Sequence, residues 1–161
     1  MKEVILKIKR KRYVKSEPTV RDVVSWCNHI KLLEEGKIET NKDAIYLMAT
    51  IVSDYLNIGI SKILSSKIKS SDISKAYRKI QTIINNSLIE SGYAISKNTD
   101  IKLFEEIYKG IMHIANDLFE KGVLPDDFFN QSLRNFILVV TLENDDSDDI
   151  MDASQVDETN F

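Results

Sequence analysis

Two pairs of residues in this sequence have types and spacings that catalysis or metal binding could use. Cys27 and His29 suggest a thiolate–imidazole pair, yet residues two apart on a helix point about 200° apart and cannot exchange a proton directly. A core cysteine beside a surface histidine is the simpler interpretation. His113 and Asp117 are four apart and share a helix face, so they could join a metal or acid–base site. A surface hydrogen bond is the simpler interpretation of that pair.

The acidic end of the chain carries part of a calcium-loop pattern. Asp145, Ser147 and Asp149 have the spacing of the first ligands. However, Ile150 stands where the loop needs glycine, and Val156 stands where it needs glutamate. The sequence also lacks a phosphate-cradling glycine loop, a paired-cysteine zinc spacing and a nucleophile elbow. We therefore expect no enzyme, no bound metal and no cofactor, but a protein that works by binding other macromolecules.

Positive charge is concentrated in KIKRKRYVK, residues 7–15, within a chain whose formal net charge is −3. This segment could neutralise phosphates while Tyr13 stacks on a base, which would make it a nucleic-acid-binding arm. The alternative is a solvated strand edge guarded by lysines.

A second candidate for binding combines aromatic and acidic residues. Phe128 and Phe129 directly follow Asp126 and Asp127, and together they could dock a partner. Packing of the two rings in the core at the start of a helix is the alternative.

Length and composition limit the class of protein. The 161 residues and 43% apolar content fit one domain. The single cysteine cannot form an internal disulfide. No segment approaches the roughly 20 apolar residues that cross a bilayer, and the start of the chain alternates apolar with basic residues, unlike a signal peptide. We therefore expect no membrane association and a location in the cytoplasm.

Hydrophobic periodicity predicts one short strand followed by helices. Val4, Leu6 and Ile8 alternate with polar-facing positions, as in a half-exposed strand. Thr19 is placed to cap the first helix, with Asp22 at the positive end of the helix dipole. Caps and apolar stripes predict helices over about 19–36, 40–57, 70–92, 99–122 and 125–142, with a short helical turn at 62–65.

In the last of these helices the inward-facing residues are expected to be Phe129, Leu133, Phe136, Ile137 and Val140, although FILVVTL could end as a strand. The predicted fold class is mainly α: a compact bundle of about five helices with a short N-terminal β element. Residues 1–142 would form the helical domain, in two parts, 1–92 and 99–142. Residues 143–161 would form a flexible acidic tail, because their few apolar residues cannot offset the entropy of ordering.

The order of these elements resembles the tail assembly chaperones of long-tailed, siphovirus-like bacteriophages. The resemblance lies in a short basic strand, the helix EPTVRDVVSWCNHIKLLEEG, a second helix ending at the aromatic-and-glycine turn of residues 55–60, and the periodic Tyr and Ile stripe of residues 77–84. It covers about the first 90 residues. The later segment LFEEIYKGIMHIANDLFEKGVLPDDFF is similar to the extension that those chaperones gain through a programmed frameshift, while the long acidic tail departs from the family's arrangement.

The resemblance implies that the chain coats the tape measure protein and delivers tail-tube subunits to it in the host cytoplasm. Assembly along a long client would need self-association into a homo-oligomer. The expected partner-binding residues are Tyr108, Asp127, Phe128 and Phe129. Two other interpretations remain open: a permanent structural or connector protein of the virion, and a small nucleic-acid-binding regulator that uses residues 7–15.

Overall fold

The computed structural model describes residues 3–36, 38–90 and 101–136 of the chain. Within these ranges the protein is mainly helical with a short two-stranded N-terminal sheet, which confirms the predicted fold class. The expected helix end at Gly92, the expected cap at Thr99, residues 137–142 and the acidic tail lie outside the described residues. No helix in the described ranges is long and apolar enough to cross a membrane.

The chain begins with an antiparallel hairpin of β1, Val4–Ile8, and β2, Lys11–Lys15. Val4, Leu6 and Ile8 are buried, as their alternation predicts. The sequence pattern predicts only one strand here, because KRYVK has too few apolar residues to show a two-residue period. The second strand forms through its backbone pairing with β1.

Helix α1, Val20–Glu34, begins at the predicted cap. The Thr19 hydroxyl accepts a hydrogen bond from the backbone N–H of Asp22 at 3.3 Å, and the Asp22 carboxylate accepts one from the backbone N–H of Thr19 at 2.7 Å. This reciprocal capping box satisfies two amides that the first helical turn leaves free. The predicted roles of both residues are confirmed.

Replacing Thr19 with alanine should lower the free energy of unfolding by about 1 kcal/mol, because the Asp22 amide loses its side-chain acceptor. Thr19→Ser keeps the hydroxyl and should retain most of the wild-type stability. Urea unfolding followed by far-UV circular dichroism measures both variants. Equal losses in the two variants would show that the threonine methyl group, and not the cap, stabilises this helix end.

The next three helices lie close to the predicted ranges. Helix α2, Asn41–Leu56, is capped by Thr40 and ends at Asn57, whose φ of 54° is left-handed. The predicted short turn is helix α3, Ile60–Ser65. Helix α4, Ser70–Glu90, carries the long isoleucine stripe.

Helix α5, Ile101–Glu120, agrees with the sequence pattern. The prediction of one continuous helix from residue 125 is wrong, because the helix is interrupted at residues 131–132. Helix α6 covers only Pro125–Asn130, Gln131 is extended with a ψ of 150°, and helical structure resumes at residues 133–136. The backbone of residues 131–133 instead pairs with the start of α1. A continuous helix across this point would lose these long-range backbone hydrogen bonds. The tertiary contact therefore overrides the local helical periodicity.

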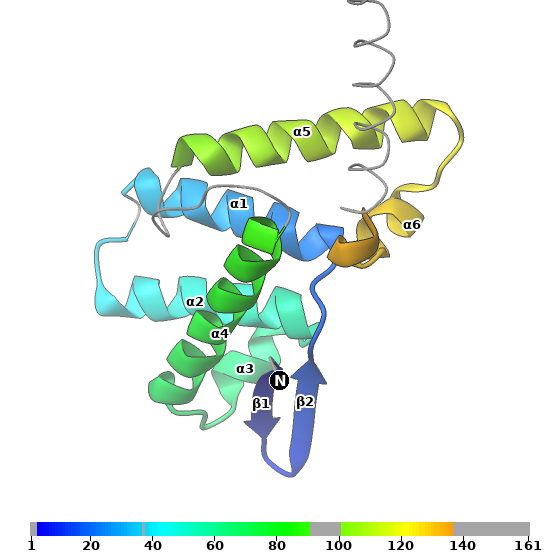
Figure 1. The fold of residues 1–161 in the computed structure, drawn as a ribbon. Helices are drawn as coiled ribbons and strands as arrows, with labels where there is room; N and C mark the ends of the chain where they lie inside the picture. Colours follow the sequence, from blue (N-terminus) through cyan, green and yellow to red (C-terminus); the bar gives the residue numbers. More distant parts are fainter. Residues whose placement is uncertain (1–2, 37, 91–100, 137–161) are drawn as a thin grey trace, which may run out of the picture.

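The buried apolar side chains form one cluster that draws on the hairpin and on all six helices. The hairpin packs against α2 and α4, α4 crosses α2, and α5 lies along α1 on the opposite side from the hairpin (Figure 1). Side chains from both predicted parts contribute to the cluster, among them Trp26 from α1 and Phe104 from α5. The short helix α6 lies beside the start of α1.

Candidate partner-binding surface

Helix α6 is fixed to the start of α1 by backbone hydrogen bonds. The Val20 amide donates to the Gln131 carbonyl at 3.2 Å, and the Leu133 amide donates to the Pro18 carbonyl at 2.9 Å. An isolated antiparallel bridge joins Thr19 to Ser132 between them. A helix of one and a half turns is not stable alone, so these bonds hold α6 in place.

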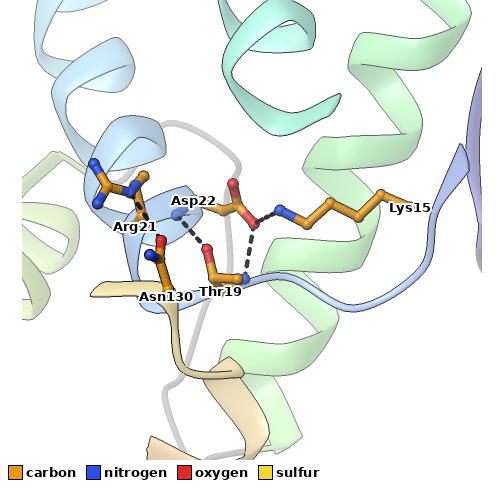
Figure 2. Close-up of polar contacts among 5 residues, drawn as sticks. All are labelled: Lys15, Thr19, Arg21, Asp22 and Asn130. Carbon is orange, nitrogen blue, oxygen red and sulfur yellow. Dashed lines mark hydrogen bonds and ion pairs between the residues drawn. The ribbon is translucent and has the colours of Figure 1, made fainter. Parts of the chain in front are cut away.

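Polar side chains reinforce this junction, as Figure 2 shows. The Lys15 ammonium donates to the Asp22 carboxylate at 2.6 Å, and the Asp22 side chain is only 4% exposed. On the other side of α1, Arg21 donates to the Asn130 amide oxygen of α6 at 3.4 Å. Arg21 also lies 3.4 Å from the Asp126 carboxylate, in a pair open to solvent. The part-buried pair of Lys15 and Asp22 joins the hairpin to α1, and the exposed contacts of Arg21 join α1 to α6.

Four phenylalanine rings cluster where α6 meets the core: Phe128 and Phe129 of α6 contact Phe119 of α5, and Phe128 also contacts Phe136. Phe128 is 2% exposed, and its ring centroid lies 5.8, 5.1 and 5.6 Å from those of Phe119, Phe129 and Phe136. These edge-to-face contacts are the geometry that aromatic quadrupoles favour. The expectation that Phe128 itself contacts a partner does not fit its burial; the ring instead anchors α6 in the core.

The exposed side of this region forms what we call the α6 surface: Val123, Leu124, Asp126, Asp127 and Phe129. Leu124 is 65% exposed, the most exposed of the large apolar residues in the described ranges. Asp126 and Asp127 are exposed, and Phe129 is half-buried. The exposed apolar residues Val123 and Leu124 therefore lie in the turn that leads into α6, and two exposed carboxylates follow them in the first turn of the helix.

The sequence analysis identifies Asp127 and Phe129 in this surface but not Val123 and Leu124. Their signal in the sequence is two large apolar residues between the helix-ending Gly122 and Pro125, where a turn would normally be polar. Tyr108, the fourth expected contact residue, does not belong here. Tyr108 is half-buried on α5, 11 residues before Phe119. Its backbone is therefore about 16 Å from that of Phe119 along the helix axis.

His29 lies in the core, 4% exposed, so the prediction of a surface histidine is wrong. Its Nε2 lies 2.8 Å from the Tyr77 hydroxyl on α4, and the Trp26 ring lies 5.4 Å from its own. Burial lowers the pKa of His29 from 6.5 to about 4. One ring nitrogen therefore serves as a core hydrogen-bonding group in the neutral state, which joins α1 to α4.

The other candidate chemical groups stay separate from one another. Cys27 is buried, as expected, and burial raises the pKa of its thiol to about 12. His113 Nε2 and Asp117 Oδ2 lie 3.8 Å apart on the exposed face of α5, beyond hydrogen-bond distance. No group of three or more His, Cys, Asp or Glu side chains that could hold a metal ion occurs in the described ranges.

The basic segment of residues 7–15 forms most of the hairpin. Tyr13 was expected to be available to stack on a base, but the ring is half-buried and two ammonium groups lie over it, Lys11 at 4.9 Å and Lys62 at 5.4 Å from its centroid. The Lys62 ammonium is the main cause that lowers the pKa of Tyr13. The hairpin therefore presents cations and not a free aromatic face.

Within the described ranges, the turn before α6 and its first residues are apolar and acidic, whereas the exposed residues of the hairpin are mostly basic. The sequence matches no protein-family model and no curated protein, and the fold matches no solved structure.

Proposed function

We propose that this chain is an assembly factor that binds another protein, and specifically a tail assembly chaperone of a long-tailed bacteriophage. In that role it holds the tape measure protein, recruits tail-tube subunits to it and self-associates along this client in the host cytoplasm. The observation that carries the proposal is the α6 surface, where the exposed Leu124 lies beside two carboxylates.

The chemistry of the α6 surface favours a protein partner with an apolar contact and a basic rim. Burying Leu124 and Val123 in the interface would favour binding through the hydrophobic effect, by roughly 25 cal/mol per Å² of apolar surface removed from water. Asp126 and Asp127 would steer a basic partner and set its orientation. Because Phe128 and the backbone bonds to α1 already fix α6, little ordering entropy would be lost on binding.

The order of the elements supports the more specific role. The short basic strand, the first helix, the turn at residues 55–60 and the Tyr and Ile stripe of residues 77–84 are the features on which the resemblance to tail assembly chaperones rests. The α6 surface lies within the segment that is similar to the family's frameshift extension. Recruitment of tail-tube subunits is therefore assigned to α6.

Leu124→Arg should weaken binding to a tail-tube protein by about tenfold or more, because it removes an apolar anchor and places a cation against the partner's basic rim. The measurement is biolayer interferometry with a purified tail-tube protein. The fold should survive, since the Leu124 side chain is 65% exposed.

Ile89→Arg is the matched control, because Ile89 is an exposed apolar residue, 48% accessible, on helix α4 and outside the α6 surface. It should bind like the wild type. Equal weakening by the two substitutions, or none by Leu124→Arg, would remove the α6 surface from the proposal.

A permanent structural role in the virion is the second candidate, and the same exposed surface would serve it. Mass spectrometry of purified particles against producing-cell lysate separates the two. A chaperone should be abundant in the lysate with tail proteins and absent from particles. A fixed copy number in particles would overturn the chaperone assignment while leaving the protein-binding surface intact.

A further inference from the structure

The tip of the hairpin and helix α3 enclose a hollow of about 390 Å³. Its lining is cationic and hydroxylic, and contains no carboxylate; besides Ile8 it consists of Lys9, Arg10, Lys11, Lys62, Ser65 and Ser66. Three of the four cations come from the hairpin turn and the start of β2, and the fourth comes from α3. The sequence alone does not associate Lys62 with the basic segment; the packing of α3 brings it there.

These cations have no acidic counterpart within the described ranges. Lys15, at the other end of β2, is paired with Asp22, whereas no ion pair between described residues involves Lys9, Arg10, Lys11 or Lys62. A left-handed φ of 54° at Lys9 turns the chain at the tip. Gathering four cations around one hollow costs electrostatic free energy unless an anion occupies it.

The outer face of the hairpin extends the positive charge beyond the hollow. Lys7 and Arg12 are exposed and lie directly opposite each other in the strand register. Like charges in this position destabilise an antiparallel pair. A ligand with several negative charges would relieve this repulsion.

We propose that this basic hairpin hollow binds the phosphates of a nucleic-acid backbone, without reading its sequence. Each strand of B-DNA carries one charge per 3.4 Å of helix axis, so neighbouring phosphates can meet the cations of the hollow and those of the adjoining strand face at the same time. The Arg10 guanidinium can hold two phosphate oxygens at once, and the Ser65 hydroxyl is exposed at the rim. Tyr13 lies under Lys11 and Lys62, so base stacking is not part of the site.

The test is fluorescence anisotropy of the full chain with a labelled mixed-sequence 20-nucleotide DNA and with its duplex, from 25 to 200 mM salt. Binding of either should weaken steeply with salt. The double variant Lys9→Gln/Lys62→Gln should lower the affinity by on the order of tenfold at the lowest salt. The slope of log affinity against log salt concentration should become less steep by about the amount that two phosphate contacts contribute.

Lys75→Gln/Lys79→Gln is the matched control, since it removes the same charge from two exposed lysines of α4. It should leave the affinity within about twofold, because these lysines lie outside the hollow. Absence of binding at 25 mM salt, or equal weakening by both double variants, would overturn the proposal. Pyrophosphate or polyglutamate binding as tightly as the DNA would also overturn it, and would assign the hollow to small phosphates or to acidic protein segments respectively.

Discussion

Phe128→Ala should destabilise the protein by about 3–5 kcal/mol, a large share of the 5–15 kcal/mol that holds a typical domain together. The ring is 2% exposed and contacts Phe119, Phe129 and Phe136, so its removal leaves a cavity that the rigid neighbours cannot fill. Urea unfolding at neutral pH gives the free energy. Hydrogen exchange should also show loss of protection at the Val20 and Leu133 amides, which tie α6 to α1.

Phe129→Ala is the control for this prediction. Phe129 is half-buried, and one of its contacts is the exposed Arg21, which lies 5.7 Å from the ring centroid. Phe129→Ala should lower the free energy of unfolding by less than half as much as Phe128→Ala does. Equal costs at the two positions would mean that α6 does not depend on the buried ring. The comparison also shows why Leu124, and not Phe128, is the residue with which to test partner binding: losing Phe128 would release the whole surface.

Acidification should destabilise the protein through His29. Its pKa is about 4 in the folded state and 6.5 when unperturbed, so the unfolded chain binds the extra proton first. The contribution of the neutral imidazole is fully present above pH 6.5 and is lost as the pH falls towards 4. Each pH unit between the two pKa values is about 1.4 kcal/mol, so roughly 2 kcal/mol should be lost between pH 7 and pH 5.

The matched variant is His29→Gln, which keeps a group able to bond the Tyr77 hydroxyl but does not titrate. The free energy of unfolding of both proteins is measured from pH 7.5 to 4.5. From neutral to acid pH, the wild type should lose about 2 kcal/mol more of its free energy of unfolding than His29→Gln does. The titration of the carboxylates affects both proteins equally and cancels in this comparison. Parallel curves would show that His29 is not held neutral by the core.

The two proposed surfaces can be tested independently. In Figure 1 the hairpin tip and α6 lie at different ends of the molecule. Substitution of Leu124 should leave DNA binding unchanged, and neutralisation of Lys9 and Lys62 should leave tube-protein binding unchanged. A chain that fails one test can still pass the other, because no residue belongs to both surfaces.

Local sequence determined most of the secondary structure. The helices over 20–34 and 41–56 follow from threonine caps and apolar stripes, and the helix over 70–90 follows from its apolar stripe, whose spacing matches 3.6 residues per turn. The burial of Val4, Leu6 and Ile8 follows from alternation in the same way. Thr19 and Asp22 could be assigned because a capping box involves residues only three apart.

Only the tertiary structure decided how distant segments meet. The break at Gln131 comes from backbone bonds to residues more than a hundred positions earlier, which no local period reveals. His29 is buried because Tyr77 of α4 supplies a partner for its ring nitrogen, and Lys62 joins the basic segment because α3 packs beside the hairpin. Phe128 and Leu124 are both large apolar residues, but in the folded chain Phe128 is buried in the core and Leu124 is exposed to solvent. Periodicity fixes which residues share a face, whereas long-range packing decides what each face contacts.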